Sequence, residues 1–278
     1  MTSTLVALQL WLAAPTAFAH GLVHHQIAKL NREIAAHPRE AALFVRRGRL
    51  WLAEDHLQAA AKDFSTALKL DADRTGAYYF LAQAELRLNR LQAARQSCQR
   101  FLQRLGPDQL GGRIRGHVLA AQIAADAHKL EEAHTHYQQA LTLSDQPNPD
   151  VVLAHVRVLQ ALARPKAAIA VLDQASAKLG GNVETLEAQA ITLLRQQHAT
   201  DEALTRLSRR IAESPMPAAL LLLKGQILLE QGDPTAAAQA ATEGLQALGR
   251  LPKSRAATAG MQSLRAQLQA LQQQPQQD

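Results

Sequence analysis

The chain has 278 residues, of which 47% are hydrophobic but only 4% aromatic, so helix formers far outnumber strand formers and an almost all-α protein is predicted. Its net charge of +6 is divided evenly between the two halves, which disfavours a basic tail or a segregated nucleic-acid face, and we expect no nucleic-acid partner. A single cysteine, Cys98, excludes a disulfide framework and a Cys-based zinc site within one chain.

Residues 1–19 have the pattern of a secretory signal peptide. An apolar run from Leu5 to Ala14 is followed by Ala17-Phe18-Ala19, with small residues at the two positions that signal peptidase inspects. The run is shorter than the roughly 20 residues that cross a bilayer, and the first four residues carry no Lys or Arg. We expect cleavage before His20 and an exported protein, periplasmic or secreted, that is not integral to the membrane after cleavage. If the leader is not cleaved, the alternative is a cytoplasmic helical cofactor protein.

Cleavage at that point would create a histidine-rich N-terminus. The free amine and imidazole of His20 could chelate one ion, and His24 or His25 could add a third nitrogen suited to Cu(II) or Ni(II). Metal handling through this terminus is therefore an alternative function. The simpler interpretation is an ordinary polar terminus, and we assign no metal site to the chain.

Residues 20–38 form a predicted helix that covers the start of a larger array. Val23, Ile27, Leu30 and Ile34 recur at helical spacing and lie before Pro38. A second such stripe occurs near the C-terminus, where Met261, Leu264, Leu268 and Leu271 alternate with polar residues. We expect capping helices at 20–38 and 251–272, and a disordered Gln-rich tail at 273–278.

Between these segments the sequence repeats itself. Gly48, Leu57, Ala60, Phe64 and Ala67 are followed 34 residues later by Ala82, Leu91, Ala94, Cys98 and Phe101. Repeat starts near residues 41, 75, 114, 149, 184 and 218 place an alanine at the twentieth position of every repeat: Ala60, Ala94, Ala133, Ala168, Ala203 and Ala237. Small residues at a regular position indicate a close approach of two helices within each repeat.

The 34-residue period and its small-residue positions resemble the tetratricopeptide repeat family. The resemblance covers about residues 41–250 and is clearest in repeats 1, 2, 3 and 6, whereas repeat 4 has Pro165 in its turn and repeat 5 has Arg210 where Ala67 and Ala140 stand. It implies an all-α fold, a right-handed superhelical solenoid of about six helix-turn-helix repeats over residues 39–250 with capping helices. The longer interval between repeats 2 and 3, which contains Gly106-Pro107 and Gly111-Gly112, is interpreted as an extended turn and as a hinge between a two-repeat and a four-repeat block.

Sequence motifs for catalysis are absent. The chain contains no nucleophile elbow, P-loop, dinucleotide fingerprint or H-E-x-x-H motif. We therefore expect a protein that is not an enzyme and that needs no cofactor.

In the family, the first helices of successive repeats line a concave groove, and the ninth residue of each repeat faces inward. Transferred to this chain, that position is polar in every repeat and carries no carboxylate, which suits the recognition of a peptide backbone or a carboxylate. The candidate groove residues are Arg49, Tyr79, Gln83, Arg87, Gln122, Arg157, Arg195 and Gln226. The expected function is a scaffold that binds an extended peptide or protein segment, with an acidic or C-terminal carboxylate group. The Lys and Asn clamp of the family's chaperone-binding members is not present, since Val45 and Arg49 occupy those positions.

Overall fold

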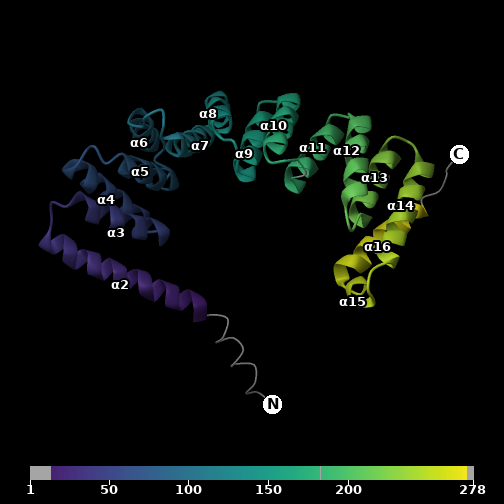
Figure 1. Cartoon of the computed structure of the whole chain (residues 1–278), viewed down its shortest axis with the longest axis horizontal. Coiled ribbons are helices and arrows are strands. Elements are labelled where there is room, and N and C mark those ends of the chain that lie inside the picture. Colours follow the sequence, from purple (N-terminus) through teal and green to yellow (C-terminus); the bar gives the residue numbers. More distant parts are fainter. Residues whose placement is uncertain (1–13, 182, 274–278) are drawn as a thin grey trace, which may run out of the picture. The chain divides into compact units, whose positions relative to one another are not determined.

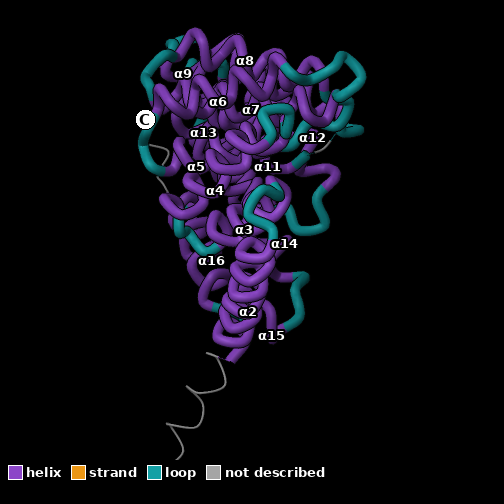
Figure 2. Tube along the Cα trace, turned by 90° about the vertical axis from the view of Figure 1, so that its left-hand side faces the viewer, coloured by secondary structure: helices purple, strands orange, loops and turns teal. Residues whose placement is uncertain are grey.

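The computed structural model describes residues 14–181 and 183–273. All regular secondary structure in these residues is helical, and short loops connect the helices (Figure 2). The helices, labelled in Figure 1, are α2 (Ala14–Ala36), α3 (Ala41–Ala53), α4 (Leu57–Leu70), α5 (Thr75–Arg87), α6 (Leu91–Gln103), α7 (Leu110–Asp126), α8 (Leu130–Leu143), α9 (Pro149–Ala161), α10 (Pro165–Lys178), α11 (Glu184–Gln196), α12 (Thr200–Glu213), α13 (Ala218–Glu230), α14 (Pro234–Gly249), α15 (Lys253–Ala256) and α16 (Ala259–Gln272). The predicted all-α fold of stacked helix pairs with capping helices is confirmed.

The helices form two compact units. Unit 1 spans Met1–Asp145 and holds α2 to α8, and unit 2 spans Gln146–Asp278 and holds α9 to α16. The interval between repeats 2 and 3, which the sequence suggested as a hinge, lies inside unit 1, where α6 packs against α7. The division falls one repeat later, after α8.

The two helices of each repeat meet at the alanine of the twentieth position. All six of these alanines are at most 1% exposed. The eighth position of the repeat faces the same contact, and at Gly48 an added Cβ would lie 2.7 Å from a ring carbon of Phe64. Larger side chains at these positions would push the helix axes apart, so the small residues set the spacing within each pair.

Helix α7 begins at Leu110, one turn earlier than the repeat start near Ile114. Gly111 and Gly112, which the sequence placed in an extended turn, lie inside this helix. Gly112 and Gly116 are both buried, and a Cβ on Gly116 would collide with Leu102. Glycine thus lets α7 approach the end of α6 closely, and that packing extends the helix.

Each turn between paired helices contains one residue in the left-handed conformation. These residues occupy the fifteenth position of the six repeats: Asp55, Asn89, His128, Ala163, His198 and Gly232. The next residue closes the helix end, as when the Arg164 N–H donates to the Leu159 carbonyl at 2.8 Å. Pro165 then occupies the first turn of α10, where proline is well tolerated, which explains its place in repeat 4.

Capping helices cover the apolar faces at both ends of the array. In α2 the buried residues Ile27 and Leu30 face α3, and in α16 Leu268 and Leu271 pack in the core with α13 and α14.

Helix α2 begins at Ala14 and continues through Ala19 and His20. Most of the expected leader, residues 1–13, and most of the expected tail, residues 274–278, lie outside the described residues. None of the described helices combines the length and the apolar character that a membrane span needs.

Replacing Ala163 by glycine should stabilise unit 2. Ala163 has φ of +54° and is exposed in its turn, and a left-handed conformation costs an L-residue about 1–2 kcal/mol. We expect Ala163→Gly to raise the free energy of unfolding by about 1 kcal/mol, measured by urea denaturation. The control Ala188→Gly, at an exposed position inside α11, should instead lower it by about 0.5–1 kcal/mol; a loss of stability with Ala163→Gly would contradict the assigned turn.

Candidate functional site

A hollow in unit 1 brings three of the predicted groove residues together. Gln83 and Arg87 of α5 and Gln122 of α7 line a cavity of about 180 Å³. Three leucines complete its wall, one from each first helix of repeats 1 to 3: Leu52, Leu86 and Leu119. The hollow thus combines an apolar surface with two amide side chains that both donate and accept hydrogen bonds.

Arg87 does not present a free charge to this hollow. Its guanidinium lies 2.6 Å from the Asp55 carboxylate and donates to the Leu52 carbonyl at 2.9 Å. Both partners belong to the preceding repeat, so Arg87 ties α5 to the end of α3. Arg87 therefore lines the hollow as predicted, with its charge compensated by Asp55.

Tyr79 and Gln83 lie on α5 next to the aromatic core of unit 1. The Gln83 amide donates to the Tyr79 hydroxyl oxygen at 3.1 Å, and the Tyr79 ring packs against Phe80 and Phe101 with centroids 5.5 and 5.2 Å away. Burial raises the pKa of Tyr79 above its usual value, so its hydroxyl stays protonated at neutral pH. This hydrogen bond fixes the orientation of the Gln83 side chain.

Arg49 on α3 is an exposed cation that rests on an aromatic ring. Its guanidinium carbon lies 5.1 Å from the centroid of the Phe80 ring, a distance typical of a cation–π contact. Its side chain makes no ion pair with a carboxylate in the described part of the chain. The N–H groups of Arg49 therefore remain available to a ligand.

Unit 2 carries the other predicted groove residues. Arg195 of α11 is bound by both carboxylate oxygens of Glu230 of α13, and this pair borders an open hollow of about 660 Å³ that also includes Thr192 and Gln231. Arg157 on α9 and Gln226 on α13 are exposed. The structure therefore divides the predicted groove residues into five in unit 1 and three in unit 2.

Sequence reasoning missed Leu52 and Leu119 as lining residues. Leu52 occupies the twelfth position of its repeat, as Leu86 does in the next. That recurrence of leucine at one repeat position was a usable signal. Leu119 had no such signal, because it occupies the sixth position of its repeat, where repeats 1 and 2 have Arg46 and Phe80.

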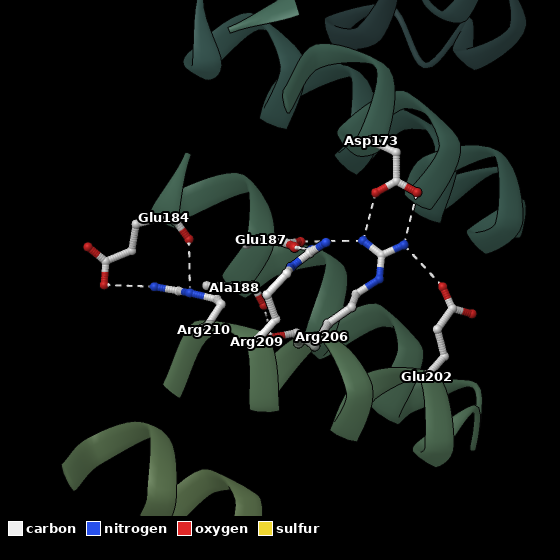
Figure 3. Close-up of polar contacts among 9 residues, drawn as sticks. Asp173, Glu184, Glu187, Ala188, Glu202, Arg206, Arg209 and Arg210 are labelled. Carbon is white, nitrogen blue, oxygen red and sulfur yellow. Dashed lines mark hydrogen bonds and ion pairs between the residues drawn. The ribbon is translucent and has the colours of Figure 1, made fainter. Parts of the chain in front are cut away.

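A charged network that joins repeats 4 and 5 was not predicted from the sequence (Figure 3). Arg206 of α12 donates to both oxygens of Asp173 of α10 at 2.6 and 2.9 Å, and it also contacts the buried Glu187 of α11 at 3.3 Å. Arg209 binds the other oxygen of Glu187 at 2.6 Å. These ion pairs join three consecutive helices and raise the pKa of Arg206 above its already high value.

The network replaces apolar contacts that other repeats make. Glu187 is the fourth residue of its repeat, where Phe44, Val152 and Leu221 are buried elsewhere. Arg210, noted in the sequence as a departure from alanine, pairs with Glu184 at 3.2 Å. Because each of these charges has an internal partner, the cluster is a structural element that holds α10, α11 and α12 together.

Two substitutions should separate the roles of the network. Arg206→Met leaves Asp173 and Glu202 without this partner and Glu187 with Arg209 alone, and should lower the free energy of unfolding by about 2 kcal/mol. Glu187→Leu places an apolar residue at this buried position, as other repeats have, and should lower the free energy of unfolding by no more than about 1 kcal/mol. Urea denaturation of both variants provides the measurement, and equal losses would show that an apolar residue at position 187 does not compensate for the lost ion pairs.

The remaining candidates from the sequence do not assemble into a site. His24 and His25 are exposed on α2, and no group of three or more His, Cys, Asp or Glu residues that could hold a metal occurs in the described ranges. Cys98 is 1% exposed, and burial raises the pKa of its thiol to about 12. A protonated, buried thiol is a core residue and a poor nucleophile.

Comparisons with known proteins agree with this architecture. Residues 45–109 and 187–259 match the family model described as tetratricopeptide repeat. A comparison with curated protein sequences finds no match.

Several solved structures have a similar fold at low sequence identity. The C-terminal part of a TPR repeat-containing protein from Cytophaga hutchinsonii superposes with a TM-score of 0.65 at 13% identity and covers 86% of this chain and 95% of its own. A tetratricopeptide repeat protein from Parabacteroides merdae gives 0.51 at 15% identity, covering 91% and 94%. PilF from Pseudomonas aeruginosa gives 0.50 at 16% identity, covering 82% and 97%.

The 34-residue period, the buried alanines between paired helices and the match of the family model lead to one conclusion: the chain belongs to the tetratricopeptide repeat family.

Proposed function

We propose that this chain is a non-enzymatic scaffold that binds an extended peptide segment of a partner protein on the first helices of unit 1. Tetratricopeptide repeats serve in general as protein-interaction modules, and the specific site follows from the hollow between α3, α5 and α7. The main support for this binding site is that Gln83 and Gln122 lie beside three leucines in one cavity.

The chemistry of the hollow suits an extended peptide. An apolar side chain of the ligand fits the leucine surface, while its backbone N–H and C=O groups pair with the two glutamine amides, which can serve as donor and acceptor. Gln83 is already oriented by Tyr79, so less side-chain entropy is lost when it binds.

Arg49 supports a preference for an acidic group or a free C-terminus in the ligand. Its guanidinium is exposed and rests on the Phe80 ring, whereas Arg87 is neutralised by Asp55. A planar guanidinium binds a carboxylate through two parallel hydrogen bonds. Arg49 is therefore the residue of unit 1 that we assign to the ligand's carboxylate.

A peptide array tests the proposal. The full chain is applied to immobilised ten-residue peptides in two versions, with free and with amidated C-termini, and the affinities of bound peptides are then measured in solution by fluorescence anisotropy. Gln83→Ala/Gln122→Ala should weaken binding about tenfold, because two hydrogen bonds of about 0.5–1.5 kcal/mol each are lost. Arg49→Gln should weaken binding of the free-carboxylate version about tenfold and leave the amidated version unchanged.

The matched control is Gln226→Ala, which removes an exposed glutamine at the same repeat position in unit 2. It should change the affinity by less than twofold. If the Gln83→Ala/Gln122→Ala protein binds as well as the wild type, the peptide does not occupy this hollow.

We also propose that the scaffold acts after export. The support is the leader-like pattern of residues 1–19, with small residues at Ala17 and Ala19. Intact-mass spectrometry of the protein from its own cells should give a chain that begins at His20. A mass that includes residues 1–19 would contradict export by this route.

A further inference from the structure

Repeat 3 carries a histidine pair at the contact between its two helices. The fourth residue of the repeat is His117 on α7, and the twenty-third is His136 on α8. Their Nδ1 atoms lie 3.3 Å apart, and the ring planes are inclined by 29° with centroids 5.5 Å apart. In repeat 4 the same two positions are Val152 and Val171, so the pair is a departure from ordinary packing.

A third donor atom lies at the same point. The Gln139 amide oxygen is 3.2 Å from Nδ1 of His136. In a neutral imidazole one nitrogen carries the proton and the other offers a lone pair. In the tautomer with the proton on Nε2 in both rings, the two Nδ1 lone pairs and the Gln139 amide oxygen lie at one point.

A metal ion would satisfy all three donors at once. Tetrahedral zinc with bond lengths of about 2.0–2.1 Å places neighbouring ligand atoms about 3.3–3.4 Å apart. The two observed separations, 3.3 Å and 3.2 Å, are close to that edge length. Beside His117 and Gln139 lies a hollow of about 370 Å³, which Thr135 also lines and which has room for a water molecule as the fourth ligand.

We propose that His117, His136 and Gln139 form a binding site for one Zn²⁺ ion between α7 and α8. The ion would link the two helices of the last repeat of unit 1. Arg113 lines the same hollow, and its positive charge opposes a cation, so the expected affinity is in the micromolar range. The site is separate from the peptide-binding hollow, with which it shares no lining residue, and it does not rest on the proposed function.

Isothermal titration with zinc chloride tests the site. The full chain, freed of metal with EDTA and dialysed, should bind one Zn²⁺ ion in addition to any weak N-terminal binding. His117→Gln and His136→Gln should each weaken this binding at least tenfold, and Gln139→Ala should weaken it severalfold. The control variants are His37→Gln, at an exposed position, and His24→Gln/His25→Gln, which removes two N-terminal histidines; both should keep the site.

A measurement on the wild type keeps the test independent of folding in the variants. Long-range ¹⁵N–¹H NMR spectra of the histidine rings should show the Nδ1 resonances of His117 and His136 shifting on zinc addition. The proposal is overturned if the wild type takes up no zinc at 100 µM, the concentration chosen at about a hundred times a micromolar Kd, or if zinc shifts only other histidines. Equal zinc affinity of folded His117→Gln and wild type would overturn it as well.

Discussion

The close contact between the two helices of each repeat is the constraint on which the rest of the structure depends. An alanine at the twentieth position, at most 1% exposed in all six repeats, lets the second helix lie directly on the first. A helix pair held in this way is still too small to bury its own apolar surface, so it must stack on its neighbours. The regular stacking then presents the first helices of successive repeats on a common face, and the hollow lined by α3, α5 and α7 arises there.

Departures from the repeat pattern are concentrated at positions where one repeat contacts the next or where its two helices meet. Repeat 5 replaces a buried apolar residue by Glu187 and pairs it with two arginines. Repeat 3 places His117 against His136. Repeat 1 pairs Arg47 with the buried Asp63 across α3 and α4. The backbone arrangement tolerates these changes because each charge or polar ring has a partner within the repeat or in the next one.

Much of the fold could be predicted from the sequence, because the repeats of one chain can be aligned with one another. Ala60 and Ala94 identify a helix contact without any other information, and the spacing of Ile27 and Leu30 identifies a covering helix. The start of α7 could not be predicted, since its two early glycines resemble a turn in sequence and act as close-packing residues in the structure. The division after α8 was also hidden, because it depends on packing between elements and not on local composition.

The candidate site was predicted only in part. The repeat register placed Gln83 and Gln122 in one hollow, but the partners of Arg87 and Arg195 lie 32 and 35 residues away and belong to neighbouring repeats. Charge pairing across that distance depends on side-chain direction, which the repeat pattern does not specify. Two of the four arginines expected to meet a ligand therefore bind carboxylates of the protein itself.

The first helices of unit 1 are the proposed binding face, and hydrogen exchange of the full chain with and without a bound peptide tests this most directly. Mass-spectrometric detection would locate slowed exchange to particular helices. We predict that the peptide slows exchange in α3, α5 and α7, whose side chains line the hollow. Slowed exchange confined to α4, α6 and α8 would place the ligand on the opposite helices and contradict the account.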